Sequence, residues 1–154
     1  MTPQAFIAAI ASAAQESAAI TGIPASFTIA QAALESGWGA SDLTTKAYNL
    51  FGIKADSAWK GSVITLPTKE FIGGKWIIQQ AKWRKYAGWL DSINDHAKFL
   101  IMNPRYRLAF TGKRTGEDFA QMVQSCGYAT DPTYCVKVGA IIRQHKLDQF
   151  DTVA

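Results

Sequence analysis

The segment from residue 59 to 86, WKGSVITLPTKEFIGGKWIIQQAKWRKY, constrains the fold most, because its composition differs from the helical patterns on either side. β-Branched and aromatic residues flank Gly73 and Gly74, and a Gly-Gly pair between two such runs indicates a two-residue hairpin turn. A turn of this length places Glu70 opposite Ile77. The segment therefore predicts one antiparallel hairpin, forming a small β-lobe at about residues 59–86.

Helical patterns occupy the rest of the chain, with start and stop signals at their ends. The predicted boundaries are Thr2 and Gly22 for the first helix, Pro24 and Gly37 for the second, and Ser41 for the start of a short third helix. After residue 89 the segments WLDSINDHAKFLIM, GEDFAQMVQSC and DPTYCVKVGAIIRQHKL predict three more helices, and Asp131 is expected to cap the last one. The order of helices, one hairpin and helices predicts a single α+β domain over residues 1–154.

The charge balance narrows the class of partner. The chain has a formal net charge of +4, which favours an anionic partner such as nucleic acid, a membrane surface or a bacterial wall polymer. The basic residues are scattered, with one modest cluster at residues 82–86, whereas a nucleic-acid groove requires a denser stripe. We therefore expect no nucleic-acid partner. No apolar run reaches the roughly 18 residues of a membrane span, so no stable membrane insertion is expected.

Glu35 stands where its ionised form is disfavoured. It lies at the end of the apolar helix of ALESGWGAS, and Gly37 and Trp38 follow one residue later. Burial beside apolar groups and the partial negative charge of a helix C-terminus both raise the pKa of a carboxyl group. A carboxylic acid that is still protonated near neutral pH is what a general acid requires. The alternative interpretation is a glutamate that caps a neighbouring helix.

Glu70 is the second carboxylate with an unusual position. Strand alternation places it near the hairpin tip, on one face with Ile64, Leu66, Thr68 and Ile72. A lone acidic residue there is typical of a lobe edge that faces a cleft. An edge charge that discourages pairing with other strands is the alternative.

The cysteines and histidines form no recognisable metal pattern. Cys126 and Cys135 lie nine residues apart, and no nearby His or Cys pair completes a zinc site. We expect two reduced, half-buried thiols, although a disulfide between them stays open. No metal and no cofactor are expected.

An ordered set of motifs resembles glycoside hydrolase family 73, the peptidoglycan-cleaving β-N-acetylglucosaminidases. The motifs are AQAALESGWGAS, NLFGIK, TKEF with GGKW, KWRKY, DSINDHAKFL and YATDPTYCVKVGAII, and they cover about residues 4 to 147. The resemblance implies a lysozyme-like fold, in which a mainly helical lobe and a small β-hairpin lobe flank a glycan groove. It also implies bacterial peptidoglycan glycan strands as the partner.

The same resemblance suggests roles for individual residues. It implies that Glu35 is the general acid, that Glu70 is the second carboxylate, and that Tyr128 of YATDP lines the groove as a third catalytic residue. The residues expected to bind substrate are Trp38, Asn49, Phe51 and Tyr134. The chain departs from the family pattern at Cys135, where a small residue is usual, and at Phe71, which stands for a common tyrosine.

The leading hypothesis is an endo-β-N-acetylglucosaminidase that cleaves β-1,4 bonds of the wall glycan. A lytic transglycosylase and an inactive wall-binding module are the alternatives. The N-terminus lacks the basic region of a secretory signal. We therefore expect synthesis in the cytoplasm without a cleaved signal, followed by action on the cell wall. Such behaviour is typical of a phage or prophage lysin or of a protein exported independently of a signal. We also expect a monomer.

Overall fold

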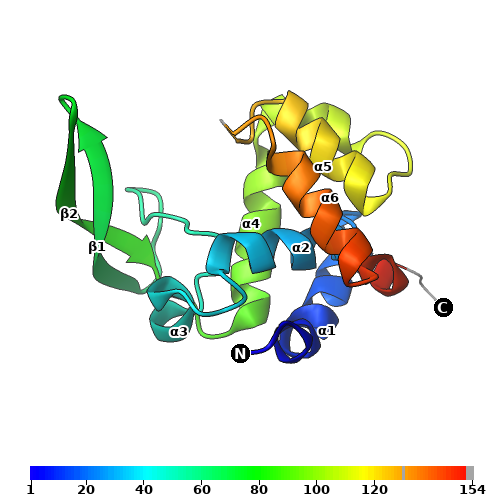
Figure 1. Ribbon diagram of the computed structural model, residues 1–154, viewed down its shortest axis with the longest axis horizontal. Coiled ribbons are helices and arrows are strands. Elements are labelled where there is room, and N and C mark those ends of the chain that lie inside the picture. The colour runs from blue at the N-terminus through cyan, green and yellow to red at the C-terminus, as the bar shows by residue number, and fades with distance from the viewer. Residues whose placement is uncertain (130, 152–154) are drawn as a thin grey trace.

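The computed structural model describes residues 1–129 and 131–151. Helices form a body to one side of a two-stranded hairpin (Figure 1). The elements in chain order are α1 (Pro3–Thr21), α2 (Ala25–Ser36), α3 (Asp42–Ala47), β1 (Val63–Ile72), β2 (Lys75–Arg84), α4 (Trp89–Met102), the 3₁₀-helix η1 (Pro104–Phe110), α5 (Gly116–Ser125), α6 (Tyr134–Gln144) and the 3₁₀-helix η2 (Leu147–Asp151). The predicted α+β class is confirmed, whereas η1 and η2 were not predicted.

The predicted ends of the first three helices are confirmed. Thr2 accepts a hydrogen bond from the backbone of Ala5 and so caps α1, while Gly22 ends it in the left-handed conformation. Gly37, at φ +57°, ends α2 in the same way. The Ser41 side chain accepts from the Thr44 backbone and caps α3. Local signals fix these ends because each depends on residues within one helical turn.

The predicted start of the last helix is wrong. Asp131 does not cap it; α6 begins at Tyr134, with Thr133 before it. The Asp131 carboxylate instead accepts hydrogen bonds from the backbone (2.9 Å) and hydroxyl (2.7 Å) of Thr133. These bonds close a turn ahead of the helix, the local alternative that Asp side chains offer the backbone. Thr130 of the YATDP motif lies outside the described residues.

Helix α2 lies at the centre of the hydrophobic core. Its residues from 25 to 33 are all buried, and it packs against α1, α5, α6 and η2. The large side chains around it that are almost wholly inaccessible include Phe6, Phe27, Leu100, Phe119 and Val138. Its C-terminal end points toward the side of the molecule that carries the hairpin (Figure 1). The core thus holds rigidly the helix whose last turn carries Glu35.

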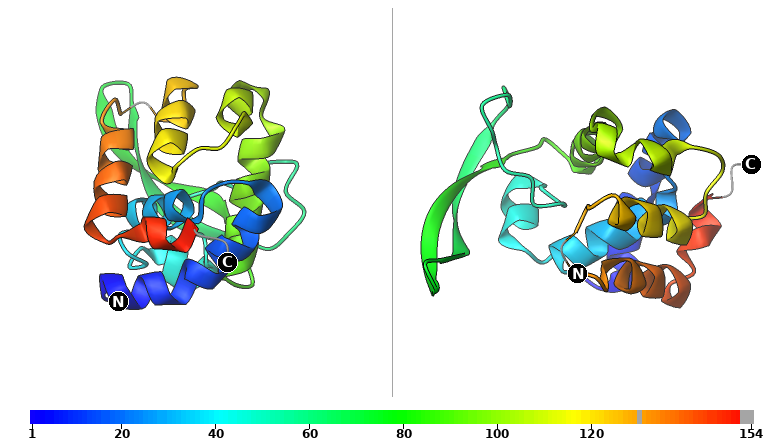
Figure 2. Two further views of the ribbon diagram at one scale, coloured as in Figure 1. Left: turned by 90° about the vertical axis from the view of Figure 1, so that its right-hand side faces the viewer. Right: turned by 90° about the horizontal axis from the view of Figure 1, so that it is seen from above.

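The hairpin has the predicted register. Strands β1 and β2 are antiparallel, and Glu70 is paired with Ile77. Gly73 and Gly74 both have positive φ, at 60° and 79°, as a two-residue hairpin turn of type I′ requires. The face that carries Glu70 is half-buried along most of β1, while Ile72 is exposed. Seen from above, the hairpin stands clear of the helices along most of its length (Figure 2, right).

The base of the hairpin is fixed to the helical body. The Arg84 guanidinium, at the end of β2, donates to Asp95 of α4 at 2.8 Å, and the Tyr86 hydroxyl donates to the same carboxylate oxygen. The Asn49 amide donates to the Arg84 carbonyl. The exposed Phe71 and Trp76 rings lie at the opposite end, beside the turn. The hairpin therefore has an anchored base and an unsupported tip.

Within the part of the chain that is described, none of the helices combines the length and the apolar character that a membrane crossing requires.

Candidate active site

Glu35 occupies the last turn of α2 with its side chain accessible from solvent. The protein packed around it removes water from one side of the carboxyl group, and this desolvation raises its pKa above the ordinary value of 4.5. The Tyr134 hydroxyl acts in the opposite direction and lowers that pKa, but by less. The predicted direction of the shift is confirmed. A substrate in solvent can therefore reach a carboxyl group whose protonated form is favoured.

Two tyrosines lie beside Glu35. The rings of Tyr128 and Tyr134 have centroids 5.6 Å apart. Burial raises the pKa of each hydroxyl well above its usual range. The negative charge of Glu35 adds to this effect at Tyr128, and the neighbouring Tyr128 phenol adds to it at Tyr134. Both phenols therefore keep their protons at neutral pH. Tyr134 is the first residue of α6, and its buried hydroxyl has no hydrogen bond of ordinary geometry with any described residue.

Gln31 lies one turn before Glu35 on α2 and is completely buried. Among the described residues, neither atom of its amide has a hydrogen-bond partner of ordinary geometry. The amide nevertheless lies close enough to the Tyr128 and Tyr134 hydroxyls to lower the pKa of each. Three polar side chains thus converge behind Glu35 from α2, from the segment before α6, and from α6 itself.

His96 completes this group from α4. Its Nε2 lies 2.9 Å from the Tyr128 hydroxyl, and its ring stacks on Phe51 with centroids 4.0 Å apart and planes at 12°. Neither His96 nor Gln31 was predicted from the sequence to belong to the site. Each is a polar residue on an otherwise apolar helix face, and Gln31 also lies four residues before Glu35, so this pattern was the available signal.

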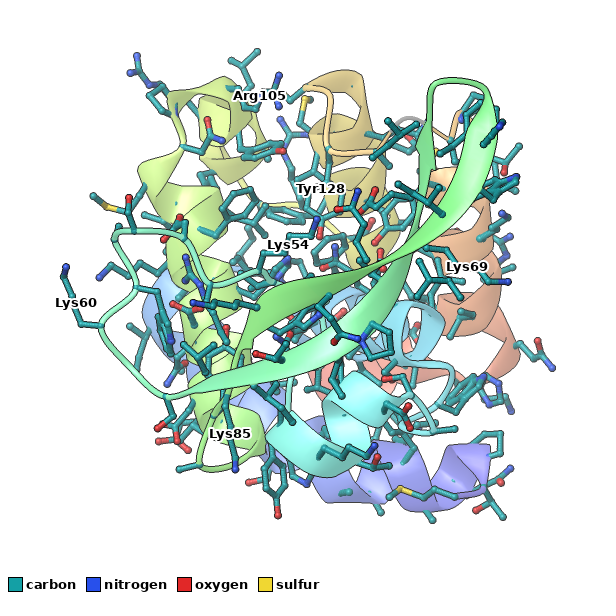
Figure 3. The ribbon with its side chains drawn as sticks, turned by 90° about the vertical axis from the view of Figure 1, so that its left-hand side faces the viewer. Lys54, Lys60, Lys69, Lys85, Arg105 and Tyr128 are labelled. Atoms are coloured by element: carbon teal, nitrogen blue, oxygen red, sulfur yellow. The ribbon has the colours of Figure 1, made fainter. Side chains whose placement is uncertain are left out.

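Glu70 lies on the opposite lobe and is ion-paired. Its carboxylate oxygen is 3.3 Å from the Lys54 ammonium, which also lies 5.6 Å from the centre of the Trp83 ring. Figure 3 views the molecule from the hairpin side, with Lys54 and Tyr128 labelled. The predicted face of Glu70 is confirmed, and Lys54 is a partner that the sequence analysis did not anticipate.

The residues expected to bind substrate have different surroundings. The Asn49 side chain is buried and makes three hydrogen bonds, to the Ile53 backbone N–H and to the carbonyls of Ile53 and Arg84. Phe51 is buried under His96, and Trp38 packs against Phe6 and His145. These contacts speak against direct substrate contact by Asn49 and Phe51. Tyr134, by contrast, lies beside Glu35.

The described residues contain no group of three or more His, Cys, Asp or Glu side chains arranged to hold a metal ion. Cys126 and Cys135 are both unpaired and half-buried. A hollow of about 750 Å³ lies at the start of α5 and beside η2. None of the predicted site residues lines it.

Comparisons with known proteins give one consistent class. A family model described as mannosyl-glycoprotein endo-β-N-acetylglucosaminidase matches residues 11–147. The chain is 40% identical over 147 residues to the peptidoglycan hydrolase FlgJ of Escherichia coli, covering 93% of this chain and 47% of that protein. It is 40% identical over 132 residues to the exo-glucosaminidase LytG of Bacillus subtilis, covering 86% and 46%. The chain thus spans about half the length of these relatives.

Solved structures agree. The glycoside hydrolase domain of Salmonella typhimurium FlgJ superposes with a TM-score of 0.81 at 38% identity, covering 94% of this chain and 98% of that one. The catalytic domain of the autolysin Auto from Listeria monocytogenes gives a TM-score of 0.86 at 34% identity, covering 97% and 87%. A helical body with one hairpin and these matches define a glycoside hydrolase domain. The chain belongs to the glucosaminidase family, which confirms the resemblance to glycoside hydrolase family 73.

Proposed function

We propose that this domain is an endo-β-N-acetylglucosaminidase that hydrolyses β-1,4 bonds after N-acetylglucosamine in peptidoglycan, with Glu35 as general acid. The observation that carries the proposal is an accessible carboxyl group whose surroundings raise its pKa. Such a group can give a proton to the glycosidic oxygen as the bond to the anomeric carbon breaks. The names of the relatives FlgJ and LytG support the choice of wall glycan as substrate.

Tyr134 and Tyr128 are proposed to serve this acid. The Tyr134 hydroxyl opposes the effect of burial on the Glu35 pKa, which keeps the acid strong enough to release its proton. Tyr128, protonated and half-buried beside Glu35, is proposed to hold the reacting sugar or the attacking water by a hydrogen bond. Both side chains lie on the helical lobe, so their positions relative to Glu35 are fixed by the core.

Glu70 is proposed as the second carboxylate, which removes a proton from the attacking water. The hairpin that carries it has an anchored base and an exposed tip, and an isolated hairpin is marginally stable unless it is packed. We propose that the glycan strand binds between the hairpin and the helical body, and that the hairpin closes on it. The net charge of +4 favours an anionic wall polymer. Action at the cell wall, as a monomer and without a nucleic-acid partner, belongs to the same proposal.

One digestion experiment tests this function against its alternatives. Purified peptidoglycan is incubated with the protein, and the soluble products are analysed by mass spectrometry with identification of the reducing end. Hydrolysis as proposed leaves N-acetylglucosamine at the new reducing ends. Products one water lighter, with anhydromuramyl ends, indicate a lytic transglycosylase, and binding without soluble products indicates an inactive module.

The size distribution of early products tests the mode of attack. An endo-acting enzyme releases fragments of many lengths from the start. A steady release of small units from chain ends, as the name of the relative LytG implies for that protein, would contradict the endo assignment.

A further inference from the structure

His96 is a polar side chain inside an apolar helix face. It lies on α4 between the buried Ile93 and Leu100 and is itself only 5% exposed. The flat face of its ring is covered by Phe51. A buried polar group at such a position calls for a partner, because leaving it unpaired costs about 1–3 kcal/mol. Its Nε2 has one, the Tyr128 hydroxyl at 2.9 Å.

The chemistry of both groups fixes the direction of this hydrogen bond. Burial lowers the pKa of His96 to about 3, so the imidazole is neutral at neutral pH and has one nitrogen that donates and one that accepts. The Tyr128 phenol keeps its proton. The Gln31 amide approaches the same phenol oxygen as a donor, since it lowers the Tyr128 pKa, whereas the one proton of the Tyr134 hydroxyl is directed at Glu35, whose pKa it lowers. The oxygen is thus the acceptor on that side, and its own proton is left for His96.

His96 is also the better-fixed contact. Neither the Gln31 amide nor the Tyr134 hydroxyl makes a hydrogen bond of ordinary geometry within the described part of the chain, whereas the distance from Nε2 to the Tyr128 oxygen is ordinary. Phe51 stacks on the imidazole and so restricts its rotation. The orientation of the Tyr128 O–H bond is consequently set by His96 of α4.

We propose that His96 is a positioning residue: its unprotonated Nε2 accepts a hydrogen bond from the Tyr128 hydroxyl and thereby turns the lone pairs of the phenol oxygen toward Glu35 and the reacting sugar. The inference rests on the role proposed above for Tyr128. It assigns His96 the tautomer with the proton on Nδ1. It also gives Phe51, which the sequence analysis placed in contact with substrate, the task of holding the imidazole in place.

A double-mutant cycle between His96 and Tyr128 tests the inference. The variants are His96→Phe, which removes the acceptor and keeps a flat ring against Phe51, Tyr128→Phe, and the two together. We expect His96→Phe to lower kcat about tenfold, the size of one hydrogen bond, with little change in KM. In the Tyr128→Phe background it should lower kcat no further, because the hydroxyl it acts through is already gone.

Two companion variants sharpen the comparison. His96→Gln should recover part of the lost turnover, since the Gln side-chain oxygen can accept from Tyr128. His145→Phe removes the only other imidazole in the sequence, which follows the last residue of α6 and, among the ring contacts of the described residues, makes none with Tyr128, and should leave kcat unchanged. If His96→Phe lowers kcat by the same factor with and without the Tyr128 hydroxyl, its effect is structural and the inference is overturned.

The outcomes separate this inference from the proposed function. Wild-type turnover in Tyr128→Phe would overturn both the role proposed for Tyr128 and the role of His96 in positioning it. Loss of activity in Glu35→Gln would still support Glu35 as the general acid. A measurement on the unaltered protein covers the case in which His96→Phe fails to fold. The ¹⁵N shifts of the two histidines should show His96 neutral, with the proton on Nδ1; a proton on Nε2 would overturn the inference.

Discussion

Asp95 of α4 holds Arg84 at the end of β2 through a hydrogen-bonded ion pair of 2.8 Å. The next residue, His96, holds Tyr128 at 2.9 Å. Consecutive residues of a helix point about 100° apart, so one turn of α4 contacts the base of the hairpin on one side and the tyrosine beside Glu35 on another. Helix α4 therefore sets the position of both lobes relative to each other.

Asp95→Ala should destabilise the protein and lower its turnover. The side chains of Asp95 and Arg84 are 16% and 17% exposed, and the substitution leaves the Arg84 guanidinium and the Tyr86 hydroxyl without their shared acceptor. We expect a loss of about 1–3 kcal/mol in the free energy of unfolding, measured by urea denaturation. Asp91→Ala removes an exposed carboxylate from the same helix and serves as the control. Equal stabilities of the two variants would contradict the anchoring role.

Glu35→Gln should abolish nearly all hydrolysis while preserving the fold. The amide has almost the same shape but cannot donate a proton to the leaving oxygen, and general acid catalysis contributes about 10²–10⁴-fold. The measurement is turnover on purified peptidoglycan alongside a melting curve. Glu16→Gln, at an exposed position of α1, is the matched control and should behave as the wild type. A Glu35→Gln variant that kept more than about a tenth of the activity would refute the assignment.

The raised pKa of Glu35 also predicts how stability depends on pH. The folded state binds this proton more tightly than the unfolded state, whose carboxyl group has its ordinary pKa of 4.5. The resulting stabilisation is complete below that value and is lost as pH rises through the folded-state pKa. Glu35→Gln lacks this dependence. Its melting temperature relative to the wild type should therefore increase from about pH 4 to pH 7, and a constant difference would argue against a raised pKa.

The same shift places the basic limb of the activity profile. Hydrolysis needs the protonated form of Glu35, so kcat/KM should fall as pH rises through the raised pKa of this group, above its ordinary 4.5. A pH series of initial rates measures the limb. A basic limb at the ordinary glutamate pKa of 4.5 would show that burial does not raise the pKa of Glu35 and would contradict this prediction.

The features that the sequence predicted are those that depend on neighbouring residues. The Gly73–Gly74 turn determines the pairing of Glu70 with Ile77, because a two-residue turn leaves one register. Gly37 ends α2 two residues after Glu35, and the apolar residues before Glu35 predict its raised pKa. Each of these inferences needs no knowledge of a distant contact.

The features that the sequence did not predict depend on the packing of distant segments. His96 and Tyr128 are 32 residues apart, and nothing near either residue specifies the other. Asn49 was expected to contact substrate, yet its amide is used by the carbonyls of Ile53 and Arg84. The error at Asp131 has another cause: two local hydrogen-bond patterns were available, a helix cap and a turn with Thr133, and the sequence favours neither.

Glu70→Gln should lower turnover strongly, but less than Glu35→Gln. The carboxylate lies on the half-buried face of β1, and its ion pair with Lys54 is solvent-exposed. Such exposed pairs contribute little to stability, so the melting temperature should hardly change, which separates a chemical effect from a structural one.

A water activated by Glu70 attacks opposite the leaving group and inverts the anomeric centre. If the N-acetyl group of the substrate is the nucleophile instead, the configuration is retained and Glu70 only orients or stabilises charge. NMR of the first products distinguishes the two routes. Retained configuration, or near-normal turnover of Glu70→Gln, would remove Glu70 as the base and leave the assignment of Glu35 intact.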